Sequence, residues 1–279
     1  MIHISDLSFG YTRKHLLYRK LTLSMDDGNV YGLLGKNGAG KSTLLKNITG
    51  TLFPTEGNIS IDNMVPRKRL PSFLKTIYYI PEDLHIPSLT LKQYVNLFAV
   101  FYPLFREDDL HRYLKELEVK VPGKINALSF GQQKKFIIAF ALACNTKVLL
   151  MDEPTNGLDI PSKTQFRKLI ASVMDEHRIL IISTHQTRDL ENLIDRVIIV
   201  DDGRLLMHAS IEEITRKFYF ETVNELPISS KILYTEKHLR GLSIVRENTT
   251  GEDTRVNLEH FFNGVTGKPA LAKEIYLTE

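Results

Sequence analysis

A glycine-rich loop of eight residues constrains the fold of this chain more than any other feature. Residues 35–42 read GKNGAGKS and match the pattern G-x-x-x-x-G-K-[ST]. The apolar run VYGLL at 30–34 precedes the loop, and a short helix is predicted after it, from Ser42 to a glycine C-cap at Gly50. A strand, a glycine-rich loop and a helix in this order predict a phosphate-binding loop in an α/β fold.

The residue types of this loop suit a nucleotide. Small residues let backbone N–H groups curl round a β-phosphate, and Lys41 adds a positive charge against the β and γ oxygens. Ser42 can offer its hydroxyl to Mg²⁺. We therefore expect ATP and Mg²⁺ as ligands. The alternative, a glycine turn without a ligand, does not explain the flanking strand and helix.

A second stretch, VLLMDEP at 148–154, adds two acidic residues to the predicted nucleotide site. Asp152 ends a buried strand, where a carboxylate is costly unless it meets a cation, and Mg²⁺ is the cation expected here. Glu153 follows and can polarise a water for attack on the γ-phosphate as a general base. The alternative is that both acids cap the strand in solvent.

Three further residues are weaker candidates. His185 follows the apolar run RILIIST at 178–184 and should emerge at the same sheet edge, where an imidazole can hydrogen-bond a γ-phosphate. Tyr11 follows the opening strand and can stack on an adenine ring. A surface histidine and a core or turn tyrosine remain open alternatives. Glu82 has no chemistry that spacing alone assigns.

The stretch LSFGQQ at 128–133 begins a strongly apolar helix that we predict to run to Ala143. Ser129 and Gln132 have the spacing of a capping box, in which each side chain binds the other residue's backbone N–H. A helix start of this kind attracts anions. The chain already has a predicted anion site in the phosphate loop. An anion site at the start of the helix at Ser129 would therefore have a separate role.

The rest of the pattern predicts an α/β core with a helical insertion. Alternation near the N-terminus indicates strands of a small sheet, and residues 86–145 read as helices. Continuous apolar runs at 148–151, 178–184 and 196–200 are typical of buried parallel strands. Asp202-Gly203 predicts a hairpin. Beyond about residue 216 the composition loosens, and a helix is predicted whose one apolar face comprises Leu258, Phe261, Phe262 and Val265.

Composition excludes several classes of protein. The 36 Lys and Arg against 33 Asp and Glu leave a net charge of +3, too small to indicate nucleic-acid binding. The single Cys144 cannot form an intrachain disulfide and is expected to pack in a helix. No segment reaches the roughly 18 apolar residues of a membrane span. The first residues show no secretion signal, so a cytoplasmic location is expected.

Together these motifs resemble the nucleotide-binding subunit of ATP-binding cassette (ABC) transporters, and within that family the ATPases of ABC-2-type exporters. The resemblance covers residues 1–215. It implies a P-loop NTPase core with a mostly parallel sheet, an antiparallel β subdomain at the N-terminus and an inserted α-helical signature subdomain at about 86–145. Residues 216–279 would form a small α+β accessory domain.

The resemblance also assigns roles to residues. In this family two cassettes meet head to tail, and the signature helix of one faces the ATP held by the other. The nucleotide contacts are then Tyr11, the Walker A residues Gly35, Lys36, Asn37, Gly38, Ala39, Gly40, Lys41, Ser42 and Thr43, the signature residues Ser129, Gly131 and Gln132, and the interface residue Asp159. The catalytic residues are Glu153, His185 and Lys41, and the metal ligands are Ser42, Asp152 of Walker B, and Glu82.

Two positions depart from the family pattern. Phe130 replaces the third residue of the more usual LSGGQ, which affects the fit around the partner's nucleotide. Glu82 stands where many members have a glutamine that reaches Mg²⁺ and senses the membrane partner; glutamate can still bind Mg²⁺ but brings a negative charge near the phosphates.

The resemblance implies partners as well. We expect a homodimer or a pair with a sister ATPase, docked on a separate transmembrane permease at the inner face of the cell membrane, without insertion into it and without nucleic acid. A groove for the permease would lie at Tyr94, Phe98, Phe101 and Tyr102. The alternative is that these aromatics only fill the helical insertion. The segment VNLEHFFNGVTG is similar to the tail of exporter ATPases and favours export. The alternatives are an importer ATPase and a soluble ABC ATPase that acts on ribosomes or DNA.

Overall fold

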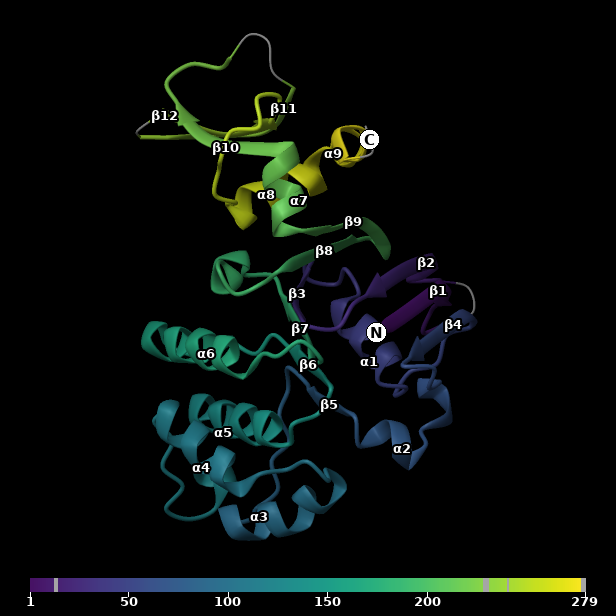
Figure 1. Ribbon diagram of the computed structural model, residues 1–279, viewed down its shortest axis with the longest axis vertical. Helices are drawn as coiled ribbons and strands as arrows, with labels where there is room; N and C mark the ends of the chain where they lie inside the picture. Colours follow the sequence, from purple (N-terminus) through teal and green to yellow (C-terminus); the bar gives the residue numbers. More distant parts are fainter. Residues whose placement is uncertain (13–14, 228–230, 240, 277–279) are drawn as a thin grey trace.

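The computed structural model describes residues 1–12, 15–227, 231–239 and 241–276 (Figure 1). A six-stranded sheet with the order β5-β6-β7-β3-β8-β9 forms its centre. Neighbours in this sheet pair in parallel except β8 and β9, which form the predicted antiparallel hairpin. The strands are β3 (Asn29–Leu34), β5 (Ile77–Ile80), β6 (Val148–Asp152), β7 (Ile179–Thr184), β8 (Arg196–Asp201) and β9 (Arg204–Ser210).

A second, antiparallel sheet covers one face of the central sheet. Its order is β2-β1-β4, with β1 at Ile2–Phe9, β2 at Tyr18–Met25 and β4 at Glu56–Ile61. Helix α1 (Lys41–Ile48) packs between the two sheets, because Leu44, Leu45 and Ile48 belong to the same buried cluster as residues of both. The phosphate loop lies between β3 and α1, as the sequence predicts.

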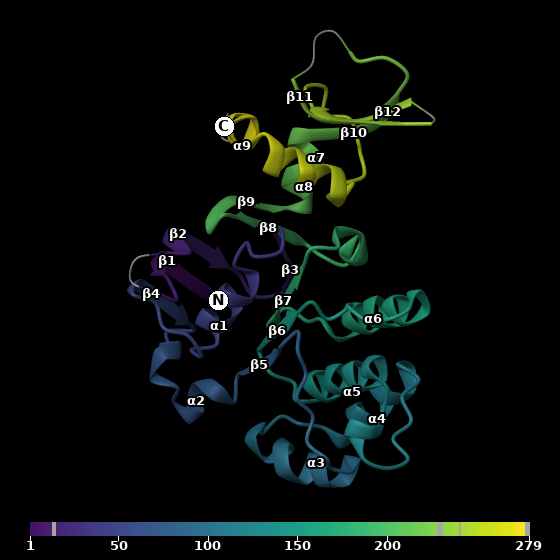
Figure 2. The ribbon, with the colours of Figure 1, turned by 180° about the vertical axis from the view of Figure 1, so that it is seen from behind.

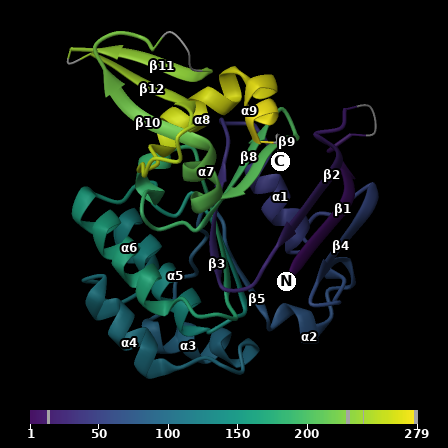
Figure 3. The ribbon, with the colours of Figure 1, turned by 45° about the horizontal axis from the view of Figure 1, so that its top comes forward.

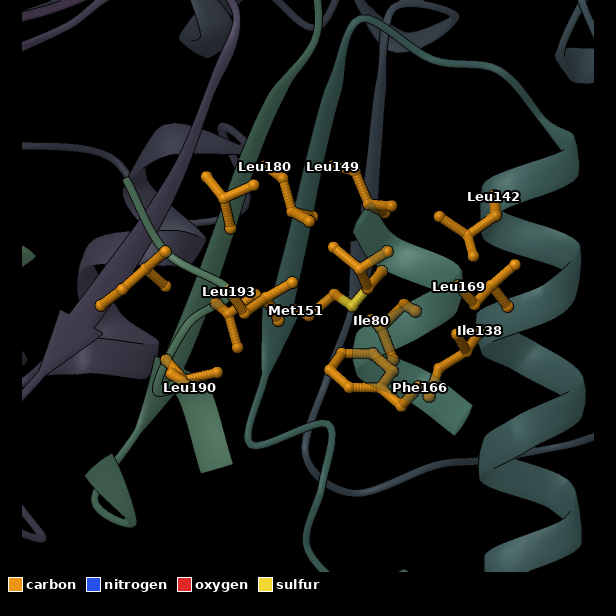
Figure 4. Packing of buried hydrophobic residues seen from close by; sticks show 14 of the residues in the cluster. Ile80, Ile138, Leu142, Leu149, Met151, Phe166, Leu169, Leu180, Leu190 and Leu193 are labelled. Atoms are coloured by element: carbon orange, nitrogen blue, oxygen red, sulfur yellow. The ribbon is translucent and has the colours of Figure 1, made fainter. Parts of the chain in front are cut away.

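Helices cover the other face of the central sheet. Leu149 and Met151 of β6 face Phe166 and Leu169 of helix α6, as Figure 4 shows. Their neighbours in β6 point to the opposite face because side chains alternate along a strand. The helical layer comprises α3 (Leu91–Phe98), α4 (Glu107–Glu116), α5 (Phe130–Ala143) and α6 (Ile160–Val173), with short turns η2 (Ala99–Phe101) and η3 (Ile125–Ala127). Two more short elements, η1 (Pro66–Lys68) and α2 (Pro71–Leu74), precede β5.

The start of α5 corrects one prediction. The side chain of Ser129 accepts a hydrogen bond from the backbone N–H of Gln132 at 3.4 Å, but the described residues show no return bond from the Gln132 side chain. Gln133 holds the preceding loop instead, because its amide donates to the carbonyls of Asn126 and Leu128 at 3.2 and 2.7 Å. The capping box is therefore only half formed.

The C-terminal region forms a third sheet at the end of the molecule opposite α3 and α4 (Figures 1 and 2). Its order is β10-β12-β11, and it is antiparallel. Its elements are α7 (Ile211–Lys217), β10 (Phe218–Val223), β11 (Ile232–His238), β12 (Gly241–Glu247), α8 (Leu258–Gly267) and α9 (Pro269–Tyr276). The predicted boundary after residue 215 falls inside α7, and a separate accessory domain stays a prediction.

Helix α8 joins the C-terminal sheet to the core, and Figure 3 shows it beside β10 to β12. Its apolar face is buried as predicted at Leu258, Phe261 and Val265, while Phe262 is partly buried. The ring of Phe261 meets that of Phe218 edge to face at 5.2 Å between centroids. Helix α8 also contacts the short turn η4 (Thr187–Leu190), which follows His185. No helix within the described ranges is both long enough and apolar enough to cross a membrane.

Candidate nucleotide-binding site

The phosphate loop opens into a cavity of about 870 Å³, a volume that suits a nucleotide. Residues from far-separated parts of the sequence meet there, because parallel strands place their carboxyl ends at one edge of the sheet. The predicted site residues that line it are Tyr11, Asn37, Gly38, Gly40, Lys41, Ser42, Thr43, Glu82, Glu153 and His185.

The loop before β2 contributes residues that sequence reasoning missed. Thr12, His15, Leu16 and Leu17 line the same cavity beside Tyr11. The available signal was their position in the connection between the first two strands, directly after Tyr11. The Tyr11 hydroxyl lies 3.0 Å from Thr43 Oγ1, and its ring meets Phe9 edge-on at 5.2 Å. The Tyr11 side chain is 67% exposed, so a ring face is open for stacking on a base.

The backbone of the phosphate loop is shaped for an anion. Gly38 and Gly40 have φ of 79° and 104°, values that favour glycine. Helix α1 starts directly after Gly40, and no side chain caps its first turn. Its free N–H groups and the helix dipole therefore face the cavity as an anion-binding surface. A phosphate group fits this surface.

Lys41 folds back over the loop. Its Nζ donates to the carbonyls of Gly35 and Lys36 at 2.8 and 3.3 Å and lies 3.6 Å from Oε1 of Glu153. Both charged side chains are buried to about the same extent, so their attraction is only weakly screened. The structure thus places one positive charge between the phosphate loop and the acidic end of β6.

Asp152 lies behind the cavity and accepts two hydrogen bonds from neutral hydroxyls. The Ser183 hydroxyl donates to Oδ1, and the Tyr79 hydroxyl donates to Oδ2 at 3.2 Å. Burial and the neighbouring Asp152 charge raise the pKa of Tyr79, which keeps this hydroxyl protonated. Neither hydroxyl brings a charge to Asp152, and the Asp152 oxygens together with the Ser42 hydroxyl are the donor type that Mg²⁺ prefers.

Glu153 is held by the next strand along the sheet. Its Oε1 accepts from the backbone N–H of His185 at 3.0 Å and lies 2.8 Å from His185 Nδ1, while its Oε2 accepts from Thr184 Oγ1 at 3.1 Å. The residue is 4% exposed and has a φ of 46°. Three contacts from the end of β7 thus orient a carboxylate that borders the cavity.

Glu82 reaches the cavity from the loop after β5. Its Oε1 accepts from the Asn156 side chain at 3.2 Å, and Asn156 Oδ1 in turn accepts from Gln186 at 3.3 Å. This chain of bonds links the loop after β5 to the residues that follow Glu153 and His185. The Glu82 carboxylate therefore has a neutral hydrogen-bonding partner, the Asn156 side chain.

Several predicted contacts do not line this cavity. Asp159 caps α6, accepting from the backbone N–H of Ser162 at 2.9 Å. Gly35, Lys36 and Ala39 belong to the phosphate loop but stay outside the lining, and Lys36 pairs with Asp201 at 3.5 Å. The signature residues Ser129, Gly131 and Gln132 are also absent from the lining, although Ser129 is exposed at the start of α5.

A second, more apolar cavity of about 660 Å³ lies between the core and the helical layer. Three of the four aromatics predicted to form a groove are involved: Phe98, Phe101 and Tyr102 line it, whereas Tyr94 is buried against Phe136 and Phe140. Phe101 is 63% exposed. The remaining lining residues are Thr49, Thr51, Arg69, Pro71, Leu74, Lys75, Ile77, Tyr78, Tyr79 and Phe140.

Comparison with known proteins identifies relatives of the whole cassette. Residues 18–156 match the family model described as "ABC transporter". The chain is 28% identical over 255 residues to the ABC transporter ATP-binding protein NatA of Bacillus subtilis, covering 87% of this chain and 100% of NatA. It is 26% identical over 235 residues to the linearmycin resistance ATP-binding protein LnrL of the same organism, covering 82% of this chain and 75% of LnrL.

Solved structures and longer relatives agree with this result. A structure described as an ATP-binding subunit of an ABC transporter superposes with a TM-score of 0.70 at 28% identity, covering 77% of this chain and 92% of the other. The human ATP-binding cassette sub-family A member 10 is 30% identical over 241 residues, or 82% of this chain, but the chain spans only 16% of that protein's length.

Proposed function

Since the chain contains the ATP-binding domain of the ABC transporter family, which implies ATP hydrolysis, we propose that it powers export through a separate membrane permease. One observation supports ATP hydrolysis as the source of that power above the others: Lys41, Glu153 and His185 converge on the cavity that the phosphate loop opens into. In the proposed cycle two cassettes close over ATP, and hydrolysis lets them separate.

Each side chain has a defined task in this proposal. The N–H groups at the start of α1 and the Lys41 ammonium bind the β and γ phosphates. Ser42 and Asp152 would hold Mg²⁺, with Glu82 as a further ligand, and the bound ion would neutralise charge on the phosphate oxygens. Glu153 accepts the proton of the attacking water, and His185 orients that carboxylate and contacts the γ-phosphate.

The position of the signature residues supports a paired cassette. Ser129, Gly131 and Gln132 are at least partly accessible and lie outside this chain's own nucleotide cavity. The exposed start of the 14-residue helix α5 is nevertheless suited to an anion. In a symmetric pair the same surface of each subunit serves the other. We assign it to the partner's γ-phosphate, with Asp159 at the same interface.

ATP-dependent dimerisation of the chain, together with its ATP turnover, tests the proposed function. The mass in solution of Glu153→Gln is measured with and without Mg-ATP, alongside ATP turnover of the unmodified chain. We expect turnover by the unmodified chain and an ATP-dependent dimer of the variant. Adding Ser129→Arg should abolish the dimer, whereas adding Ser172→Arg, an exposed serine at the far end of α6, should not. Full ATPase activity in Glu153→Gln would refute the role of Glu153.

The apolar cavity with Phe101 supports a permease as the partner. An exposed aromatic beside an apolar cavity of this size suits an apolar segment of another protein. Phe101→Glu should lose co-purification with membranes that hold the permease while it keeps ATP-dependent pairing. Leu226→Glu, at an exposed leucine of the C-terminal region, is the control.

Between export and import, we favour export. LnrL carries linearmycin resistance in its name, and resistance to a compound suits its removal from the cell. Isolation with a permease but without any substrate-binding protein would agree with export, and isolation with such a protein would indicate an importer. Sedimentation with ribosomes and never with membranes would instead indicate the non-transport alternative.

A further inference from the structure

Lys134, in the second turn of α5, is a fully buried lysine close to the nucleotide site. Its Nζ donates to the backbone carbonyl of Glu153 at 2.7 Å and to that of Asn156 at 3.1 Å. Burial lowers the pKa of Lys134, while the carboxylates of Glu82 and Glu153 favour its charged form. A buried ammonium is costly unless it is well hydrogen-bonded, so these two carbonyls are its stabilising partners.

The two carbonyls belong to the turn that carries the general base. The backbone N–H of Asn156 donates to the carbonyl of Glu153 at 3.2 Å and closes the turn 153–156. Glu153 has a φ of 46°, a left-handed conformation that a residue with a side chain adopts at a cost. The surroundings must therefore hold this backbone in place, and Lys134 supplies two of the bonds that do so.

Phe130, in the signature segment LSFGQQ, lies beside the Lys134 ammonium that binds the turn 153–156. The Lys134 Nζ lies 5.4 Å from the centroid of the Phe130 ring, within range of a cation–π interaction. The ring also lies against Gly157, where an added Cβ would come within 2.9 Å of it. The signature segment and the turn after β6 thus meet directly through these two side chains.

We propose that Lys134 is a positioning residue for Glu153: its ammonium ties the turn 153–156 to helix α5. The proposal rests on the ATPase function proposed above. Helix α5 begins at the signature, which faces the partner's nucleotide in the closed pair. Lys134 then connects the partner's nucleotide at the start of α5 to the base that serves this chain's own nucleotide.

A pair of neighbouring lysines provides the test. Lys134→Met keeps an unbranched side chain only one atom shorter and removes the three donors of the ammonium. Lys135→Met is the matched control, because Lys135 is also buried in α5 but its Nζ contacts Gln165 of α6 at 3.4 Å, away from the turn. The full chain is measured for kcat and KM of ATP hydrolysis and for hydrogen–deuterium exchange at residues 153–158 without nucleotide.

The expected result distinguishes an effect on the orientation of Glu153 from an effect on ATP binding. Lys134→Met should lower kcat by about 10-fold or more, with KM changed by less than about twofold, because the base is misplaced while the phosphate loop is intact. Amide exchange at 153–158 should become faster. Lys135→Met should change neither quantity. Lys134→Gln, which keeps one donating group, should recover part of the lost kcat.

Defined outcomes overturn the proposal. It fails if Lys134→Met retains kcat within about twofold or leaves exchange at 153–158 unchanged. It also fails if Lys135→Met shows the same losses, because that pattern reports general destabilisation of α5. Should Lys134→Met not fold, Lys134→Gln is judged by the same two measurements. An unmodified chain without ATP turnover contradicts the proposed function alone, and the exchange measurement then decides on Lys134.

Discussion

His185 contacts Glu153 twice, through its backbone N–H at 3.0 Å and through Nδ1 at 2.8 Å, both to Oε1. The two residues directly follow neighbouring parallel strands, β7 and β6, so the contact joins two segments that are 32 residues apart in the chain. His185 therefore supplies two of the three contacts that orient the carboxylate bordering the nucleotide cavity.

Replacing His185 by alanine should lower turnover more than binding. The lost Nδ1 contact lets the Glu153 carboxylate move, and misplacing a reacting group by about 1 Å costs roughly 100-fold in rate. We expect that loss in kcat, with a smaller rise in KM because His185 is also assigned a contact with the γ-phosphate; steady-state ATP hydrolysis measures both quantities. His177→Ala, at an exposed histidine just before β7, should behave as the unmodified chain. Equal losses in both variants would contradict the role of His185.

Replacing Lys41 by methionine should weaken ATP binding. A hydrogen bond to a charged group contributes about 1.5–3 kcal/mol, so the affinity should fall by roughly 10- to 100-fold. Titration calorimetry with ATP measures this change. Lys46→Met is the matched control, because Lys46 lies on the same helix α1 and does not line the cavity. Unchanged affinity in Lys41→Met would show that the lysine is not a phosphate ligand.

Gly40→Ala should destabilise the fold by about 2 kcal/mol or more, because strain and overlap add. The residue has a φ of 104°, and a Cβ there would clash with the hydroxyl of Tyr18. At Gly38, with a φ of 79°, nothing lies within 4 Å of an added Cβ, so only the backbone cost of about 1–2 kcal/mol is expected. Urea unfolding measures both variants, and equal losses would argue against a tight Tyr18–Gly40 contact.

His208 of β9 should make stability depend on pH. Burial, and then the nearby Arg196 charge, lower its pKa, while Glu213 and Asp26 act in the opposite direction. A lowered pKa means that the unfolded chain binds the proton more readily than the folded one. The contribution is therefore complete above about pH 6.5 and is lost as the pH falls below that value. Chemical unfolding from pH 8 to 5 measures it, and His208→Asn should flatten the curve; an unchanged slope would refute this assignment.

The sequence predicted those parts of the fold that depend on local patterns. The order of strand, phosphate loop and helix, the apolar strands β6, β7 and β8, and the buried face of α8 are all present as predicted. Each follows from a pattern within a few residues: a glycine-rich turn, a short continuous apolar run, or apolar residues at helical spacing. The capping box is only half formed, because a spacing in the sequence shows which side chain can reach a backbone group and not whether it does so; Gln133, not Gln132, binds the preceding loop.

By itself, the sequence determined which residue types are candidates for the nucleotide site and in what order they occur along the chain. Only the tertiary structure decided which side chains share a contact, such as Lys134 with the turn of Glu153, Tyr79 with Asp152, and Leu16 with the cavity. The physical reason is that these contacts join segments far apart in the chain. Their formation depends on how strands and helices pack around buried polar groups, and a local pattern carries no information on that packing.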